Sequence, residues 1–135
     1  MSRARAAFSI CLPLMCAAAC STSVRAEIGR VRYVTDGDTF RLESGERIRI
    51  ANIDAPEIHV RQAKCRLEFT RGEAASKQAR TLLDGKIVTF ERVGRSYNRT
   101  VARVRVNGRG PGKTLIALGA AKPWLRYNPK PGWCS

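Results

Sequence analysis

Residues 36–57 read DGDTFRLESGERIRIANIDAPE, and this stretch decides the fold. In its middle, two short runs alternate apolar and polar residues, one from Phe40 to Glu43 and one from Arg47 to Ile50. Strict alternation is typical of a strand with one buried face, and the Ser44-Gly45 pair between the runs supplies turn residues. The stretch therefore predicts a β-hairpin that brings its acidic first and last residues together at one end.

An arginine lies beside those acidic residues. In a strand, successive side chains point to opposite faces, so Arg49 points away from the face that Ile48 and Ile50 share. Buried packing alone does not explain carboxylates that converge with an arginine. Taken singly, Asp38 and Asp54 each also fit an ordinary turn residue, and it is their combination with Arg49 that indicates a functional site.

The rest of the chain supplies three further strands and two helices. A capping-box pattern starts the first helix, which places Ala75, Ala79 and Leu83 on one stripe, and Gly85 suits its C-terminal cap. The elements predicted around the hairpin are a strand over Ile28–Val34, a helix begun by Thr70-Arg71-Gly72-Glu73, a strand over Lys86–Arg92, a loop over Gly94–Asn98, a strand over Arg99–Val106 and a short helix from Pro111 to Gly119.

This order of elements predicts a mainly β (α+β) fold. Three strands, a helix, two strands and a second helix fit an OB-type, five-stranded Greek-key barrel with about two helices. The pattern alone also fits an SH3-like barrel or an open α+β sheet. The chain shows no internal repeat and no linker between domains.

The charge of the chain favours a polyanionic partner. Among 135 residues, 25 are Lys or Arg and 11 are Asp or Glu, which gives a formal net charge of +14. Such an excess indicates nucleic acid or an anionic membrane surface as the partner. A basic surface without any specific ligand is the plain alternative.

The first 26 residues predict an export signal. The segment opens with a positively charged region that includes Arg3. The apolar run from Ala6 to Cys20 is short for a bilayer span, and small residues favour cleavage after Ala26. The remaining domain is then 27–135, without a transmembrane segment. Its net charge stays strongly positive, because only three of the 25 basic residues precede the cleavage point.

Cysteine usage agrees with export to the periplasm or the medium. Cys11, Cys16 and Cys20 fall in the signal, whereas Cys65 and Cys134 remain in the domain. Two cysteines in a small exported domain predict a disulfide, with two free thiols as the alternative. A zinc site is excluded because the domain has no further cysteine and a single histidine. A second interpretation of the signal makes Cys20, which follows three alanines, the anchor of a lipoprotein.

These motifs together resemble a known family. The chain is similar to the thermonucleases, whose best-known member is staphylococcal nuclease, over about Val31 to Tyr127. DGDT followed by an arginine and DAPE, with Y-x-R after a helix, is a specific combination. The matching segments are 34–39, 48–57, 72–74, 97–102 and 115–121.

The resemblance implies a chemistry and a set of roles. It implies calcium-dependent hydrolysis of phosphodiester bonds in both DNA and RNA, at the rim of an OB barrel, leaving 3′-phosphates. By motif, the matched residues are Asp38, Asp54 and the backbone carbonyl of Ala55 as calcium ligands, Arg49, Glu57 and Arg99 as the catalytic trio, and Tyr97 and Tyr127 as substrate-binding residues.

Elementary chemistry supports these roles. Calcium takes oxygen ligands, so Asp38 and Asp54 can bind it without histidine. Glu57 is a candidate general base, and two guanidinium groups present fork-shaped donors to the charge that grows on a phosphate under attack. Three departures from the family pattern are Arg95 in place of an acid, Asn98 in place of a glycine and Leu125 in place of an aromatic residue.

The sequence therefore predicts an exported, calcium-dependent, sugar-nonspecific nuclease. Its partners would be single-stranded or frayed DNA and RNA, and the protein would act as a monomer without a stable protein partner. One alternative is a catalytically weak OB-type protein that only binds nucleic acid. Against it, a binding module has no need for Glu57 beside two aspartates, since all three repel phosphate. A basic protein of the membrane surface or cell wall is the third possibility.

Overall fold

The computed structural model describes residues 23–135. The predicted export signal and the alternative anchor Cys20 lie almost entirely outside the described residues. In chain order the elements are β1 (Glu27–Asp36), β2 (Thr39–Leu42), β3 (Arg47–Ile50), β4 (Ile53–Asp54), α1 (Arg66–Leu83), β5 (Ile87–Ser96), β6 (Arg99–Arg105), α2 (Pro111–Ala117) and β7 (Lys122–Pro123).

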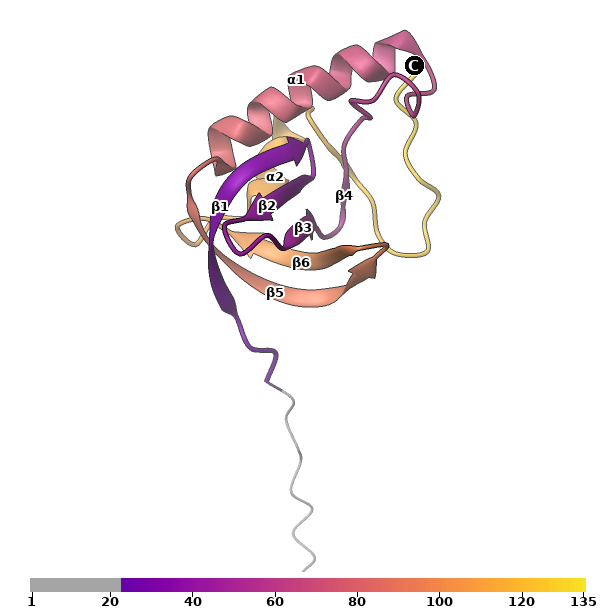
Figure 1. Ribbon diagram of the computed structural model, residues 1–135. Coiled ribbons are helices and arrows are strands. Elements are labelled where there is room, and N and C mark those ends of the chain that lie inside the picture. The colour runs from indigo at the N-terminus through magenta and orange to yellow at the C-terminus, as the bar shows by residue number, and fades with distance from the viewer. Residues whose placement is uncertain (1–22) are drawn as a thin grey trace, which may run out of the picture.

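Five strands close into a barrel in the order β1-β2-β3-β6-β5 (Figure 1). β3 and β6 run parallel, whereas the other neighbouring strands, including the pair β1 and β5 that closes the barrel, are antiparallel. The predicted OB-type five-stranded barrel with two helices is confirmed, and an open sheet is excluded.

The alternating residues of the hairpin fill the barrel as predicted. Phe40 and Ile48 are completely buried and pair across β2 and β3. Burying a side chain of this size stabilises the fold by roughly 1.5–3 kcal/mol. α1 lies along the barrel with the predicted stripe of Ala75, Ala79 and Leu83 buried against it (Figure 1). The helix therefore packs against the hairpin region that holds the acidic residues.

The predicted start of the first helix is wrong by one turn. α1 begins at Arg66, and its N-cap is Cys65, whose sulfur accepts a hydrogen bond from the Glu68 N–H at 3.3 Å. Thr70, the predicted cap, lies inside the helix and its hydroxyl donates to the Arg66 carbonyl. A serine, threonine or acidic residue is the usual cap, so the sequence pattern favoured the wrong residue.

The fourth barrel strand is longer than predicted. β5 continues through Ser96, so the loop predicted over Gly94–Asn98 shrinks to a turn at Tyr97 and Asn98. The left-handed residue of this turn is Tyr97, with φ of 54°, although asparagine adopts that conformation more readily. The turn holds Tyr97 outward at the barrel rim.

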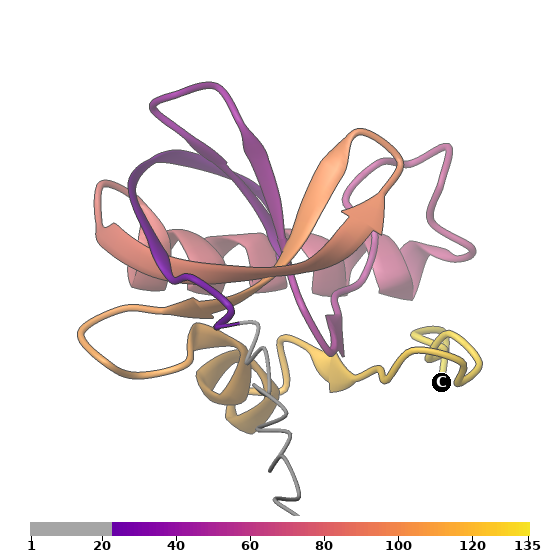
Figure 2. The same cartoon turned by 90° about the horizontal axis from the view of Figure 1, so that it is seen from below.

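Two short strands were not predicted. β4 pairs with β7, and this two-stranded sheet attaches the segment after α2 to the acidic end of the hairpin. From β7 the C-terminal tail runs past β4 and ends beside the first turn of α1, as both views show (Figures 1 and 2). There Cys134 forms the predicted disulfide with Cys65.

Within residues 23–135, no helix combines the length and apolar character that a bilayer crossing requires.

Candidate active site

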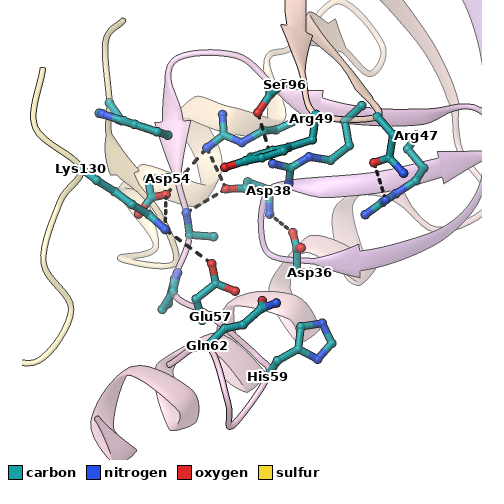
Figure 3. Close-up of a pocket in the computed structure, with 16 residues that line it drawn as sticks. Asp36, Asp38, Arg47, Arg49, Asp54, Glu57, His59, Gln62, Ser96 and Lys130 are labelled. Atoms are coloured by element: carbon teal, nitrogen blue, oxygen red, sulfur yellow. Dashed lines mark hydrogen bonds and ion pairs between the residues drawn. The ribbon is translucent and has the colours of Figure 1, made fainter. Parts of the chain in front are cut away.

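A pocket of about 610 Å³ opens at the barrel rim (Figure 3). The β1–β2 turn, β3, the segment from β4 to α1, the β5–β6 turn and the C-terminal tail all contribute to its lining. Seven of the eight predicted site residues line it, namely Asp38, Arg49, Asp54, Ala55, Glu57, Tyr97 and Arg99. The fold thus gathers residues that are up to about 60 positions apart, whereas their individual roles stay predictions.

Asp38 links the two acidic motifs. Its side chain is almost completely buried, and one oxygen accepts a hydrogen bond from the Thr39 hydroxyl at 2.8 Å. The other oxygen accepts from the Ala55 N–H at 3.1 Å and from the Arg49 guanidinium at 3.3 Å. The DGDT turn and the DAPE segment therefore have a fixed separation.

Arg49 is buried and held in place from several sides. Its Nη2 also donates to the Ile53 carbonyl at 2.9 Å and lies 3.7 Å from Asp54 Oδ1. The Trp124 ring lies beneath the guanidinium, 5.1 Å from ring centroid to Cζ. Such stacking and ion pairing restrict the rotamers of a long side chain, so the donors have one orientation.

Asp54 is 1% exposed and lies at the back of the pocket. Its Oδ2 accepts a hydrogen bond from the Trp133 indole N–H at 2.9 Å, while Lys130 Nζ lies 3.7 Å from Oδ1. Burial raises the pKa of Asp54 above its ordinary value, although the Trp133 hydrogen bond and nearby cations oppose that shift.

Asp36 is a third aspartate in the lining and was absent from the predicted ligands. Its Oδ1 accepts a hydrogen bond from the Asp38 N–H at 3.1 Å. Burial, followed by the charge of Asp38, raises the pKa of Asp36 to about 7. The DGD pattern contains the signal, because residues two apart across a tight turn bring both carboxylates to one end.

Glu57 and Arg99 line the pocket from different elements, Glu57 from the segment between β4 and α1 and Arg99 from β6. Glu57 Oε1 lies 3.5 Å from Lys130 Nζ (Figure 3). Arg99 donates to the hydroxyls of Thr39 at 3.3 Å and Ser96 at 3.4 Å. These bonds to neutral hydroxyls leave the charge of Arg99 without a carboxylate partner among the described residues. Arg99 is therefore suited to an anionic ligand.

Sequence reasoning missed the contribution of the C-terminal tail. Trp124 and Lys130 line the pocket, and the indole N–H of Trp133 donates to Asp54. The tail lacks any regular alternation of polar and apolar residues, so periodicity gave no signal there. His59 and Gln62 also line the pocket.

A second groove of about 390 Å³ continues from the pocket along the barrel. It shares Arg49 and Trp124 with the first and adds Arg103, Arg126 and Tyr127. Tyr127, the eighth predicted residue, is 90% exposed here, with the Arg126 guanidinium 5.3 Å from its ring centroid. Exposed aromatic rings among arginines are the surface that unpaired bases and phosphates bind.

The oxygen donors fit a hard cation. Asp38, Asp54 and the Ala55 carbonyl all come to this pocket, and a carboxylate oxygen that accepts one hydrogen bond keeps a further lone pair. Burial is the first cause of the raised pKa of both Asp36 and Asp54, and the charge of Asp38 adds to it. Within residues 23–135, no group of three Asp, Glu, His or Cys side chains is placed to hold a metal ion. Water and substrate oxygens would therefore complete the coordination of a cation.

Comparison with known proteins identifies the family. Residues 47–132 match the family described as Staphylococcal nuclease homologue. Two proteins described as "Uncharacterized endonuclease", one from Escherichia coli O157:H7 and one from Escherichia coli, are each 32% identical over 108 residues. The match covers 76% of this chain, which spans 65% of the length of these curated relatives. The matched segment runs from β3 to the tail and contains most of the pocket, so the chain belongs to the staphylococcal nuclease homologue family.

Proposed function

We propose that this protein is a calcium-dependent, sugar-nonspecific nuclease that hydrolyses phosphodiester bonds of DNA and RNA and leaves 3′-phosphates. One observation carries the proposal: a single pocket holds Asp38, Asp54 and Glu57 together with Arg49 and Arg99. Family membership and relatives described as endonucleases support it.

Two aspartates and one backbone carbonyl would hold the cation. Asp38, Asp54 and Ala55 supply hard oxygen donors, which suit calcium. When bound, calcium would offset the charge of the phosphate and lower the pKa of a coordinated water. Asp36 lies next to this set, where its Oδ1 accepts a hydrogen bond from the Asp38 N–H, and a bound divalent ion would favour its ionised form.

Glu57 and the arginines would act on the phosphate. Glu57 takes a proton from the attacking water or orients it, and the water oxygen bonds to phosphorus as the bond to the 5′ oxygen breaks. The 5′ oxygen leaves with a proton from solvent, so the phosphate stays on the 3′ side. Arg49 and Arg99 donate to the phosphate oxygens as their charge grows. Because Arg49 is already fixed by Trp124 and the Ile53 carbonyl, little reorganisation accompanies the reaction.

The second groove would bind the strand on one side of the cleaved bond. Tyr127 offers a face for stacking, and Arg103 and Arg126 meet phosphates without reading the base. Tyr97, in the β5–β6 turn that lines the first pocket, would contact a neighbouring nucleotide. Stacking and phosphate contacts tolerate both ribose and deoxyribose, which supports a substrate range of DNA and RNA.

Export is part of the proposal. Residues 1–26 carry the signal pattern, domain 27–135 follows, and the disulfide between Cys65 and Cys134 suits an oxidising compartment. We propose a periplasmic or released monomer, with attachment through Cys20 as the alternative. Detection of the mature N-terminus by mass spectrometry of the exported protein distinguishes the two.

Cleavage and binding measured separately test the function. Single-turnover cleavage of a labelled single-stranded oligonucleotide should require calcium, and chelation should abolish cleavage while binding largely survives. Magnesium should restore activity poorly, since it requires a tighter shell and releases water reluctantly. Tight binding without calcium-stimulated cleavage would instead establish the catalytically weak binding protein.

A further inference from the structure

The last eight residues, 128–135, form a C-terminal arm that is fastened at its end. Cys134 is bonded to Cys65 at the start of α1. Arg71 of α1 donates to the Trp133 and Ser135 carbonyls, both at 2.8 Å. On the other side, Lys122 of β7 donates to the Gly132 carbonyl at 2.6 Å. These contacts fix the backbone on both sides of Trp133.

Trp133 carries the arm into the active site. Its side chain is buried, with 4% of the residue exposed, and its indole N–H donates to Asp54 Oδ2 at 2.9 Å. Lys122 Nζ lies 4.5 Å from the centroid of the Trp133 ring. The two partners of this hydrogen bond are 79 residues apart in the sequence. The arm thus reaches the carboxylate from outside the barrel.

The bond to Trp133 fixes how Asp54 presents its other oxygen. Oδ1 is the atom that lies 3.7 Å from both Arg49 and Lys130, two of the cations that line the pocket (Figure 3). β4 is only two residues long, so its pairing with β7 gives the side chain little support by itself. Packing of the terminus needs only an apolar ring, whereas the Trp133 indole donates its N–H to the buried Asp54 carboxylate.

We propose that Trp133 is a positioning residue for Asp54, and that the disulfide between Cys65 and Cys134 sets the calcium affinity of the pocket by holding the arm in place. The inference rests on the proposed function only in taking Asp54 as a calcium ligand. A hydrogen-bond partner behind a metal ligand orients that ligand, and its loss typically lowers metal affinity by roughly 10–100-fold.

Calorimetric titration of calcium into the purified full chain with its disulfide formed tests the inference. Trp133→Phe keeps the ring and removes the N–H, and should weaken calcium binding roughly tenfold. The double variant Cys65→Ser with Cys134→Ser should lower affinity to a similar extent by releasing the arm. Adding Trp133→Phe to the double variant should cause little further loss, since both changes remove the same interaction.

Trp124→Phe is the matched control. It makes the same substitution in the same part of the chain, but the indole N–H of Trp124 donates to the Asn128 carbonyl. Calcium affinity should therefore change much less than in Trp133→Phe, since the Phe ring still lies beneath Arg49 and no carboxylate loses a donor. Circular dichroism before titration shows whether each variant is folded.

A spectroscopic measurement on the unmutated chain makes the test independent of folding in the variants. The protein has two tryptophans, hence two indole N–H resonances, and Trp124→Phe assigns them. Calcium should shift the resonance of Trp133 and protect it from hydrogen exchange. A Trp133 resonance that ignores calcium, while calorimetry shows binding, overturns the inference.

The outcomes separate this inference from the proposed function. Calcium-dependent cleavage with unchanged calcium affinity in Trp133→Phe and in the serine double variant would overturn the role of Trp133 and leave the nuclease standing. Calcium binding that depends on Trp133 and on the disulfide, in a protein that cleaves no nucleic acid, would support the inference and overturn the nuclease.

Discussion

Arg49 combines charge with a fork of donors, and a single substitution separates the two. Arg49→Lys keeps the charge but loses the planar guanidinium, whose orientation is fixed by the hydrogen bonds to the Ile53 carbonyl and Asp38. We expect kcat to fall by roughly tenfold or more with a smaller change in KM, because the lost donor matters most in the transition state. Single-turnover cleavage at saturating calcium measures this.

Arg47→Lys on the same strand is the matched control for that substitution. Arg47 also lines the pocket, but its guanidinium donates to the Asn98 side chain. A much smaller loss of kcat is expected. Equal losses in the two variants would show that the charge of the pocket matters and that the geometry of Arg49 does not.

Residues inside the regular hairpin were predictable, and residues of the tail were not. Asp38, Arg49 and Asp54 occupy fixed positions relative to alternating strands, so their convergence followed from the period of two. Trp133 and Lys130 reach the same pocket through an irregular segment, where direction depends on tertiary contacts with α1 and β7. The disulfide was predicted, but the hydrogen bond that it secures was not.

At the scale of elements, Gly72 sets the distance between α1 and the segment that carries Glu57. A Cβ at Gly72 would lie 2.3 Å from the Glu57 carbonyl oxygen and 3.0 Å from that of Pro56. We expect Gly72→Ala to displace residues 56–57 and to lower kcat together with stability, the latter by about 1–3 kcal/mol. Thermal unfolding and single-turnover cleavage measure the two effects.

Gly94→Ala serves as its control for stability. A Cβ there meets no atom within 4 Å, so the substitution should be nearly neutral. For Gly72, which lies in α1, replacing glycine by alanine would stabilise the helix by about 0.5–1 kcal/mol if no clash opposed it. A stabilised and fully active Gly72→Ala protein would mean that α1 and the Glu57 segment are free to separate.

The observed element boundaries differ from the predicted ones where a local sequence pattern competed with a contact to a distant part of the chain. The residues from Thr70 match a capping box, yet the helix begins earlier, at Arg66. The N-cap is Cys65, which the disulfide holds in place. Similarly, β5 extends through Ser96 because β6 supplies backbone partners along its whole length. Two-residue strands such as β4 and β7 are too short for any periodicity to appear.

At the scale of the whole molecule, one charged cluster helps to close the barrel. Arg92 of β5 bonds Glu27 of β1, Glu46 of the β2–β3 turn and the Thr100 hydroxyl of β6. The hydrogen bond from Arg92 is the main cause that lowers the pKa of Glu46 below its ordinary value, and a hydrogen bond from Thr100 adds to it. A carboxyl with a lowered pKa in the folded state stabilises the fold above its unfolded pKa, and loses that contribution as pH falls through the folded pKa.

Glu46→Gln should therefore lower stability at pH 7 by about 1 kcal/mol, and the difference from the unmutated protein should shrink as pH falls below about 4. Thermal unfolding across that range measures it. Glu43→Gln in the same turn is the control, because the Glu43 carboxylate is 61% exposed and lies 3.9 Å from its nearest cation, Arg30. A constant difference at all pH values would exclude the ionised Glu46 as the cause.

The excess of basic residues should attract a nucleic-acid strand along the second groove, and substitutions along β6 test this. Arg103 lines the second groove, whereas Arg105 lies on the same face of β6 outside it. Each phosphate contact on a single strand contributes about 0.7 to the slope of log affinity against log salt. Arg103→Glu should weaken binding of a single-stranded oligonucleotide and reduce the slope by roughly that amount, with kcat unchanged at saturation.

Two variants with the same change of charge separate the groove from the total charge. Arg105→Glu and Lys77→Glu, the latter on the exposed face of α1, should each weaken binding less and leave the slope nearly unchanged, because neither residue lines a pocket. Fluorescence anisotropy between low and physiological salt measures all three. Equal losses in the three variants would mean that the whole basic surface attracts the strand, since only direct phosphate contacts distinguish Arg103 from residues of the same charge elsewhere.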